Sequence, residues 1–378
     1  MKESIYKLLQ SLFSLLPIQR KKILFLSYYG SQYGCNPKYL SEYIVKNHKD
    51  WHVVWGFVHP DKYQIGGIQK ERYLSWRFFY ELCTSQVFVT NYRMPLFYQK
   101  RAGQLYLQTW HSSLRLKTIE KDAEQTLPPH YVEMAKADSK RTDLLLSGCQ
   151  YSTEIFKRSF WYEGPIIPSG TPREDLLFHE EGRDEIKRKL NVPKDCQLVL
   201  YAPTFRKDNS LRYYDIDFRK LVQTLEEIRG GQWKVLLRLH PHLRDFSKKL
   251  CKEACVIDAT AYDDIQELLK VADMVISDYS SLIFDFALTK RPCLLYVPDL
   301  EEYTKKDRQL YFKVEQLPFP VCQTNEQLLQ LIANFDEVKY KQDIQGFLET
   351  IGSYETGHAS ENVFNQIISY LKNRWKRK

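Results

Sequence analysis

Residues 274–288 read MVISDYSSLIFDFAL, and this stretch decides the fold. The apolar, β-branched run at 274–277 predicts a buried strand, and the apolar spacing over 282–288 predicts a helix. A short connection, Asp278–Ser281, separates them. A strand that leads directly into a helix is the repeating unit of a parallel sheet covered by helices, so this stretch predicts an α/β fold.

The same alternation extends along the rest of the chain and falls into two sets. A polar, charged stretch at 178–195 separates them, and a length of 378 residues suits two domains. The sequence therefore predicts two Rossmann-like domains with parallel sheets, facing each other across a central cleft. The predicted strands lie at 22–28, 53–57, 87–90, 105–109 and 144–147 in the first set, and at 198–202, 233–239, 256–258, 274–277 and 293–296 in the second.

The expected division has four parts. They are an amphipathic, membrane-facing helix at 1–20, an N-terminal domain at 21–177, a C-terminal domain at 178–358, and a crossing helix with a basic tail at 359–378. Leucines crowd one side of the first segment and cations follow it, which suits an anionic bilayer surface; packing on the protein's own first sheet is the equal alternative. The cations around Trp375 in the tail suit lipid headgroups or open solvent.

Composition excludes several classes of protein. Apolar residues make up 43% and charged residues 27%, which argues against a disordered chain, a collagen or a coiled coil. No run of about 18 apolar residues occurs, so no membrane-spanning helix is expected. The formal charge of +8 raises nucleic-acid binding as a rival class. Apart from the ends, that charge is spread along the chain and no nucleic-acid motif occurs, so no nucleic-acid partner is expected.

Eight cysteines at irregular spacing predict reduced thiols in a cytosolic protein, because a chain of this size needs no disulfides. Cys251 and Cys255 follow His240 and His242, which raises a zinc site. Structural zinc sites have tighter spacing, so a helix face with two small apolar residues is favoured and no metal site is expected.

Five polar clusters follow predicted strands. Ligands of parallel sheets bind beyond the carboxyl ends of the strands, so these clusters form the candidate site. The clusters are Thr109-Trp110-His111-Ser112-Ser113, Gly170-Thr171-Pro172-Arg173-Glu174-Asp175, Ala202-Pro203-Thr204-Phe205-Arg206, Arg238-Leu239-His240-Pro241-His242 and Ser277-Asp278-Tyr279-Ser280-Ser281.

The last cluster opens a helix and has the clearest physical role. A helix N-terminus offers unpaired N–H groups and a partial positive charge, and Ser280 and Ser281 add hydroxyl donors, which suits a diphosphate. Asp285, one turn further on, suits the hydroxyls of a sugar or polyol. An ordinary helix cap at Ser280 or Ser281 is the alternative interpretation.

A second group of candidates supplies bases and cations. His111 at a strand end suits a general base that takes a proton from a hydroxyl; a buried structural histidine is the alternative. Arg238 and His240 alternate along one strand and suit charge on a phosphate or a departing nucleotide. Arg173 and Arg206 suit phosphate oxygens or surface ion pairs.

Other catalytic templates are missing from the sequence. It contains no G-x-x-x-x-G-K-[ST], G-x-G-x-x-G, H-E-x-x-H or G-x-S-x-G. Asp215-Ile216-Asp217 has the D-x-D pattern of some metal-dependent glycosyltransferases, but it precedes an amphipathic run, so helix capping is the better interpretation.

Taken in order, the five clusters resemble the CDP-glycerol glycerophosphotransferases, the teichoic-acid primases and polymerases. Asn36-Pro37-Lys38 and Tyr296-x2-Asp299-x3-Tyr303 fit the same pattern, and the resemblance covers residues 22 to 370. It implies a two-domain GT-B fold. The chain departs from the family pattern at Ser112, where Gly is usual, at Leu114-Arg115-Leu116-Lys117 and at Asp307-Arg308-Gln309-Leu310-Tyr311. These departures leave the polyol and the acceptor open.

The resemblance also implies roles for individual residues. His111 corresponds to the family's proposed base, and His240 is the second catalytic candidate. The implied donor-binding residues are Trp110, Ser112, Ser113, Arg173, Pro203, Thr204, Arg206, Arg238, Ser280, Ser281 and Asp285. No cofactor is implied beyond the donor substrate, and a divalent ion travelling with the diphosphate stays open.

The resulting hypothesis is transfer of glycerol phosphate from CDP-glycerol to a hydroxyl of a lipid-linked glycan or of a teichoic-acid or capsule precursor, with release of CMP. CDP-ribitol as the donor, and a GT-B glycosyltransferase using a nucleotide sugar, are the alternatives. The expected location is the cytoplasmic face of the cell membrane, as a peripheral protein on an anionic surface.

Overall fold

A computed structural model gives the fold, and it describes residues 2–206, 211–239, 243, 247, 250–251, 253–306 and 309–376. The chain forms two compact units. Unit 1 contains Met1–Ser113, Ile119–Asp175 and Ser353–Lys378, and unit 2 contains Leu114–Thr118 and Leu176–Gly352. The short segment Leu114–Thr118, expected in the first domain, therefore belongs to unit 2, and the chain returns to unit 1 a few residues before the final helix.

Unit 1 is built on a seven-stranded sheet with the strand order β3-β2-β1-β4-β5-β6-β7, and each pairing in it is parallel. In the register, Phe25 lies opposite Trp55 on one side and Val89 on the other. Its strands are β1 (Gln19–Leu26), β2 (His52–Phe57), β3 (Gln69–Arg72), β4 (Ser85–Thr90), β5 (Leu105–Gln108), β6 (Leu144–Ser147) and β7 (Ile166–Pro168). Its helices are α1 (Lys2–Phe13), α2 (Cys35–Asn47), α3 (Trp76–Thr84), α4 (Pro129–Arg141), α5 (Gln150–Ser159) and α14 (Ala359–Lys376).

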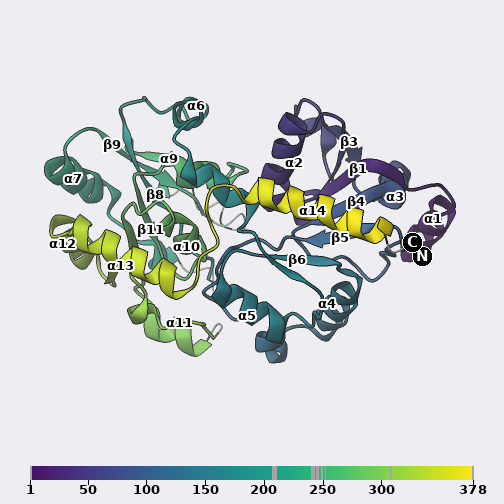
Figure 1. Ribbon diagram of the computed structural model, residues 1–378. Coiled ribbons are helices and arrows are strands. Elements are labelled where there is room, and N and C mark those ends of the chain that lie inside the picture. The colour runs from purple at the N-terminus through teal and green to yellow at the C-terminus, as the bar shows by residue number, and fades with distance from the viewer. Residues whose placement is uncertain are drawn as a thin grey trace. The chain divides into compact units, whose positions relative to one another are not determined.

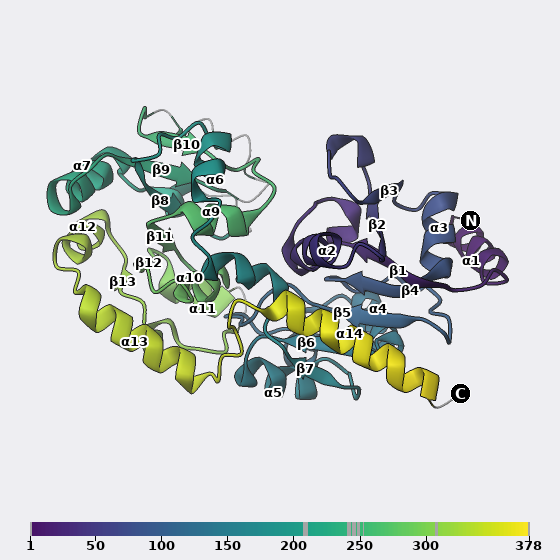
Figure 2. The same ribbon diagram turned by 45° about the horizontal axis from the view of Figure 1, so that its top comes forward.

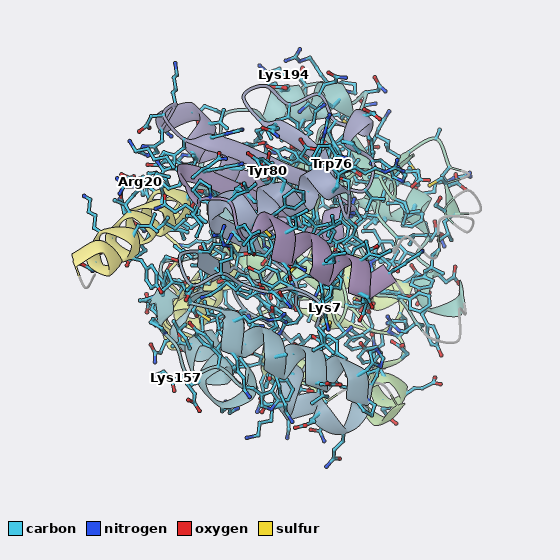
Figure 3. All side chains as sticks on the ribbon, turned by 90° about the vertical axis from the view of Figure 1, so that its right-hand side faces the viewer. Lys7, Arg20, Trp76, Tyr80, Lys157 and Lys194 are labelled. Atoms are coloured by element: carbon cyan, nitrogen blue, oxygen red, sulfur yellow. The ribbon has the colours of Figure 1, made fainter. Side chains whose placement is uncertain are left out.

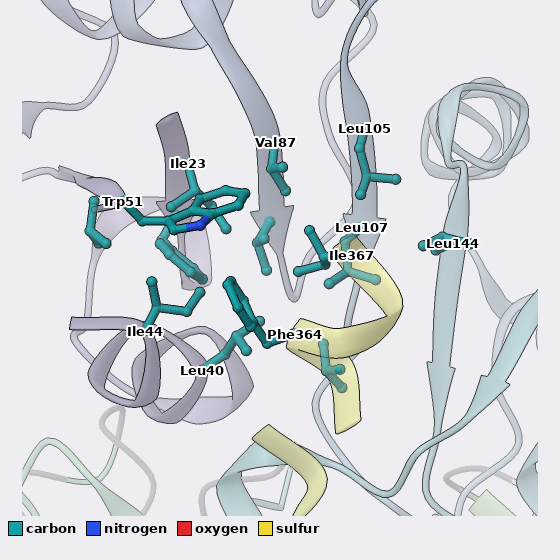
Figure 4. Packing of buried hydrophobic residues seen from close by; sticks show 14 of the residues in the cluster. Ile23, Leu40, Ile44, Trp51, Val87, Leu105, Leu107, Leu144, Phe364 and Ile367 are labelled. Carbon is teal, nitrogen blue, oxygen red and sulfur yellow. The ribbon is translucent and has the colours of Figure 1, made fainter. Parts of the chain in front are cut away.

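Helices cover both faces of this sheet (Figures 1 and 2). On one face, Leu40 and Ile44 of α2 and Phe364 and Ile367 of α14 pack against alternate strand residues such as Ile23 (Figure 4). On the other face, α3 packs on the sheet and α1 packs on α3. The last helix of the chain thus completes the core of the first unit.

Unit 2 repeats the plan with a six-stranded parallel sheet in the order β10-β9-β8-β11-β12-β13. Its strands are β8 (Gln197–Tyr201), β9 (Trp233–Leu237), β10 (Val256–Asp258), β11 (Met274–Ser277), β12 (Cys293–Tyr296) and β13 (Val321–Cys322). Its helices are α6 (Arg183–Lys189), α7 (Phe218–Arg229), α9 (Ile265–Val271), α10 (Leu282–Ala287), α11 (Leu300–Lys306), α12 (Asn325–Ala333) and α13 (Glu337–Thr350). Two parallel α/β sheets confirm the predicted fold class, and the central cleft stays a prediction.

The structure differs from the expected elements at the edges of the sheets. The short strands β3, β7 and β13 carry polar residues, a proline or only two residues, so they lack the apolar signal of a buried strand. The first helix ends at Phe13, and the cations at 20–22 belong to β1 instead of the helix. Within the described ranges, each helix is too short or too polar to cross a bilayer.

Candidate functional site

All five polar clusters begin within two residues of the carboxyl end of a strand. β5 ends at Gln108, β7 at Pro168, β8 at Tyr201, β9 at Leu237 and β11 at Ser277. Because the strands of each sheet are parallel, the first two clusters share one edge of the sheet in unit 1, and the other three share one edge in unit 2.

In unit 1, Asn36 holds the first two clusters together. Its Nδ2 donates to the carbonyl oxygens of Thr109 (3.3 Å) and Trp110 (3.1 Å), and its Oδ1 accepts the N–H of Arg173 at 3.1 Å. Asn36 is fully buried at the start of α2. A single amide therefore ties the loop that carries His111 to the loop that carries Arg173.

The turn at Trp110 presents His111 at the sheet edge. Trp110 has a φ of 51°, in the left-handed region that a residue with a side chain rarely adopts, and its N–H donates to Oε1 of Gln108 at 3.0 Å. Its ring packs against Phe160 (4.8 Å between centroids) and His111 (4.3 Å). Tyr92 also stacks on the imidazole, with 5.8 Å between ring centroids. His111 is half-buried and contacts two aromatic rings, which restrict its orientation and leave part of it accessible.

A buried carboxylate, Glu355, lies beneath the same two loops. It accepts the N–H of Thr171 on both oxygens (3.1 and 3.0 Å) and the Thr171 hydroxyl at 2.8 Å. The Ser113 hydroxyl also bonds to it. Burial raises the pKa of Glu355 to about 8, and the nearby Asp175 acts in the same direction. Sequence analysis missed this residue, because its partner Thr171 lies 184 residues away and no motif surrounds it.

Glycines make room for this carboxylate. A Cβ on Gly148 would lie 2.0 Å from Ser113 Oγ and 2.4 Å from Glu355 Oε1, and a Cβ on Gly170 would lie 2.7 Å from Glu355 Oε2. Position 148 therefore excludes any side chain. The close approach holds the end of the His111 loop, at Ser113, against the start of α5.

The remaining residues of the second cluster also make contacts inside unit 1. Arg173 is buried, and its Nε donates to Glu174 Oε1 at 3.0 Å. Asp175 caps α14, accepting the N–H groups of Ala359 (2.7 Å) and Ser360 (2.8 Å). Arg173 as a contact to phosphate stays a prediction.

In unit 2, Arg206 lies at the centre of a buried ion cluster. Its guanidinium pairs with Asp278 (2.9 Å) and Asp299 (2.6 Å), and these carboxylates raise its pKa. Asp278 in turn accepts the N–H of Thr204 at 2.8 Å. Tyr279 donates to Asp299 at 3.1 Å and stacks on Tyr303 at 3.7 Å, 4 residues beyond Asp299 in sequence. The structure thus unites the third cluster, the fifth cluster and the Asp299–Tyr303 motif around one arginine.

The serines of the fifth cluster lie at the start of α10, a helix of six residues. Ser281 Oγ accepts the N–H of Leu116 at 3.3 Å, and Ser280 Oγ lies 3.5 Å from the N–H of Leu282. Asp285 is buried and accepts from Gln266 Nε2 at 3.2 Å. Each of these residues already has a protein partner, so their roles towards a diphosphate and a polyol stay predictions.

Two of the three departures from the family pattern meet in unit 2, where residues 116–118 lie beside residues 309–311. Leu116 and Thr118 bond through their backbones to Tyr311 (2.8 Å) and Gln309 (2.9 Å), and Lys117 pairs with Leu310 in an antiparallel bridge. Leu116 also contacts Ser281, whereas the third departure, Ser112, belongs to unit 1.

Among the other predicted residues, Arg238 follows β9 directly and donates to the carbonyl oxygens of Ala259 (3.3 Å) and Tyr262. His240 lies outside the described residues. Asp217 caps α7 by accepting the N–H of Lys220 at 3.0 Å, as predicted for the D-x-D sequence. Cys251 and Cys255 pack against the core of unit 2. In the part of the chain that the structure describes, no group of three or more His, Cys, Asp or Glu residues is arranged to hold a metal ion.

The predicted residues fall into two groups by exposure. One group is partly exposed at the sheet edges and is accessible to a ligand: His111, Thr204, Arg238, Ser280 and Ser281. The other group is buried: Trp110, Ser112, Ser113, Arg173, Pro203, Arg206 and Asp285.

Comparison with known proteins agrees with the order of the clusters. Residues 8–369 match the family described as CDP-glycerol:poly(glycerophosphate) glycerophosphotransferase. The teichoic acid poly(glycerol phosphate) polymerase of Bacillus subtilis (strain 168) is 35% identical, over 96% of this chain and 50% of its own length. The protein of the same description from Bacillus spizizenii (strain ATCC 23059 / NRRL B-14472 / W23) is 32% identical, over 96% of both chains. The chain spans about half the length of two of the curated relatives that it matches.

Solved structures agree with this result. The wall teichoic acid polymerase TagF has a TM-score of 0.84 at 30% identity, over 98% of this chain and 94% of that chain. A putative UDP-N-acetylglucosamine 2-epimerase from Listeria monocytogenes shares the fold alone. Its identity is 13% and its TM-score is 0.54, over 96% of this chain and 98% of that chain. Since the family match spans nearly the whole sequence and relatives above 30% identity cover almost all of it, the chain belongs to the CDP-glycerol:poly(glycerophosphate) glycerophosphotransferase family.

Proposed function

We propose that the protein transfers glycerol phosphate from CDP-glycerol to a hydroxyl of a teichoic-acid precursor carried on a lipid. The observation that carries this proposal is the family match over residues 8–369, with all five polar clusters at the carboxyl ends of strands. The proposed reaction joins the acceptor oxygen to the phosphorus that bears glycerol. The bond from that phosphorus to the bridging oxygen breaks, CMP leaves with the electron pair, and the acceptor proton passes to a base.

His111 is the proposed base. Its imidazole contacts the rings of Trp110 and Tyr92 on a strained turn, and these contacts orient it before a substrate arrives. The accessible hydroxyls of Thr204, Ser280 and Ser281 are assigned to the donor's diphosphate.

The buried residues serve the donor in a different way. Arg206 and Asp278 hold the Thr204 loop through their ion pair and the N–H of Thr204, so we assign them to positioning. The resemblance to the family assigns the remaining candidates as donor contacts. They are Trp110, Ser112, Ser113, Arg173, Pro203, Arg238, His240 and Asp285.

Ribitol is the second candidate polyol. The teichoic acid ribitol-phosphate primase of Bacillus spizizenii is 30% identical over 97% of this chain and 95% of its own length. Isothermal titration with CDP-glycerol, CDP-ribitol and a UDP-sugar tests the donor. CDP-glycerol is expected to bind tightest, tighter binding of CDP-ribitol would reassign the polyol, and a preference for the UDP-sugar would contradict the proposal.

The membrane is the second proposed partner, at the cytoplasmic face and through α1. One side of this helix packs on its own unit, with Tyr6 5.1 Å from Phe79 between ring centroids and Gln10 fully buried. The other side exposes Ile5, Leu8 and Leu12, and the turn after the helix exposes Leu15; these four side chains are between 50% and 83% exposed. Figure 3 looks onto this helix, on which Lys7 is labelled. An exposed apolar stripe beside cations suits the interface of an anionic bilayer.

Flotation with anionic vesicles tests this contact. The intact chain is expected to float with the vesicles at low salt, and a Leu8→Ser/Leu12→Ser variant is expected to stay at the bottom, because two apolar anchors are lost. Failure of the intact chain to float would contradict the membrane proposal and leave the transfer reaction unaffected.

A further inference from the structure

Unit 1 contains a cleft at the edge of its sheet opposite to the polar clusters. Arg20 and Lys21 at the start of β1, Gln86 at the start of β4, the loop 48–51 before β2, and the last turns of α14 line it. These are the amino ends of parallel strands, so the length of β1, about 25 Å for eight residues, separates this cleft from the loops of the candidate site. The cleft therefore belongs to neither the His111 loop nor the Arg173 loop.

The size of the cleft and its lining, which is partly apolar and partly charged, indicate an amphiphilic ligand. Its volume is about 910 Å³, within the range of ligand sites. Trp51, Phe364, Ile368 and Leu371 form the apolar part of its lining. Figure 4 shows the Trp51 and Phe364 rings projecting between α2, α14 and the strands.

The charged part of the lining is positive. Three cations, Arg20, Lys21 and Lys372, line the cleft together with one carboxylate, Asp50. Lys21 pairs with Asp50 at 2.6 Å, but both side chains are more than half exposed, so the pair is weak and easily exchanged for another anion. His48 stacks on Phe364 at 3.9 Å, and its buried Nε2 has no hydrogen-bond partner among the described residues. Cations beside aromatic and aliphatic surface match a phosphate attached to an apolar chain.

The surroundings of the cleft point to a bilayer as the source of such a ligand. Along the chain, the exposed Leu15 and Leu16 follow α1, and Arg20 at the rim of the cleft comes four residues after Leu16. Arg20 lies near α14 in Figure 3. A headgroup phosphate in a bilayer that contacts α1 is therefore presented within a few residues of these cations.

We propose that this cleft binds the headgroup phosphate of an anionic bilayer lipid, with Arg20, Lys21 and Lys372 around the phosphate and the first carbons of the chain against Trp51 and Phe364. The inference rests on the proposed docking of α1. It makes the protein selective for anionic lipid through a built site, beyond the general attraction of cations to a negative surface.

Two substitutions on α14 separate a built site from general attraction without changing charge. Ser369 is exposed and lines the cleft, so Ser369→Trp fills it, whereas Gln366→Trp places the same ring on an exposed position of the same helix outside the cleft. The wild type is expected to partition onto phosphatidylglycerol vesicles more strongly than onto phosphatidylcholine vesicles. Ser369→Trp is expected to lower the phosphatidylglycerol partition by ~5-fold or more, the equivalent of one lost cation contact, and Gln366→Trp is expected to match the wild type.

The proposal would be overturned if Ser369→Trp partitioned onto phosphatidylglycerol vesicles as strongly as the wild type. It would also be overturned if Gln366→Trp lost as much partition as Ser369→Trp. A titration with inorganic phosphate and glycerol phosphate distinguishes the source of the phosphate. Saturable binding that Ser369→Trp removes would assign the cleft to a soluble phosphate ester and overturn the lipid assignment. With a water-soluble acceptor, the wild type and Ser369→Trp are expected to release CMP from CDP-glycerol equally. A failure of the transfer proposal is then seen separately, because the wild type itself would release no CMP.

Discussion

The two units hold their site loops by opposite electrostatic means. In unit 1 the buried carboxylate of Glu355 accepts N–H and O–H groups of Thr171 and bonds to the Ser113 hydroxyl, and burial raises its pKa. In unit 2 two carboxylates, Asp278 and Asp299, enclose the guanidinium of Arg206. Neutral donors therefore organise the edge that presents His111, and an ion cluster organises the edge that presents Thr204. Removal of His111 should consequently affect catalysis, and removal of the Arg206 charge should affect stability.

The largest effect is expected at His111, where the comparison predicts lost activity with intact folding. General base catalysis contributes about 10²–10⁴-fold, so His111→Ala should lower kcat by that factor. CMP release and thermal unfolding are measured together, and His130→Ala, an exposed histidine of the same unit, is the control. Full activity of His111→Ala would refute its role as the base.

The next effect is expected in unit 2. Arg206→Met leaves two buried carboxylates without their cation and should lower the free energy of unfolding by about 3–5 kcal/mol. The matched control is Arg219→Met, because Arg219 forms an exposed pair with Glu253 (2.8 Å), which is worth roughly 0–1 kcal/mol. Denaturant unfolding measures both variants. Equal stability of the two variants would contradict the structural role of the ion cluster.

A smaller effect, with a distinctive pH dependence, is expected at Glu355. Its pKa in the folded protein, about 8, lies above the ordinary value of 4.5, so the folded state binds the proton more tightly. The stabilisation is fully present below pH 4.5 and is lost as the pH rises through 8. Glu355→Gln should remove this slope, and it should lower stability at pH 5 by about 1–3 kcal/mol because its amide NH₂ faces donors.

Unfolding free energies at pH 5, 6, 7 and 8.5 test this, with the gap between wild type and Glu355→Gln narrowing as the pH rises. If the unfolding free energies of wild type and Glu355→Gln changed in parallel with pH, the pKa of Glu355 in the folded protein would be the ordinary one, which would contradict the prediction. Glu355→Asp is the conservative variant, because it keeps a carboxylate. A kcat of Glu355→Asp closer to the wild-type value than the kcat of Glu355→Gln would indicate that the carboxylate positions the His111 loop.

The smallest expected effects come from two glycines and have opposite signs. Gly148→Ala places a Cβ against Ser113 Oγ and Glu355 Oε1 and should destabilise the protein by about 1–3 kcal/mol. Gly346→Ala lies within α13 with nothing within 4 Å of the new Cβ, so it should stabilise the protein by about 0.5–1 kcal/mol. The same sign for both in thermal unfolding would contradict the close packing at Gly148.

The sequence predicted the buried strands and the position of the polar clusters, because both follow from local patterns. The β-branched run at 274–277 forms strand β11, and the loop after it lies at the carboxyl edge of the parallel sheet, where ligands of such sheets usually bind. Edge strands such as β3 were missed, because their residues are polar and half-exposed.

The side-chain partners at the site were beyond local patterns. Arg206 was predicted as a contact to phosphate, yet its carboxylate partner Asp299 lies 93 residues away in sequence. Glu355 reaches Thr171 across 184 residues. The spacing of residues along the chain does not encode such long-range pairing, whereas the fold makes it visible.

The central claim is tested most directly by mass spectrometry of a synthetic lipid-linked acceptor after incubation with CDP-glycerol. We predict that the acceptor gains glycerol phosphate as CMP appears, and that His111→Ala lowers both products together. An unchanged acceptor and no CMP, or addition of a sugar from a nucleotide sugar instead, would contradict the account.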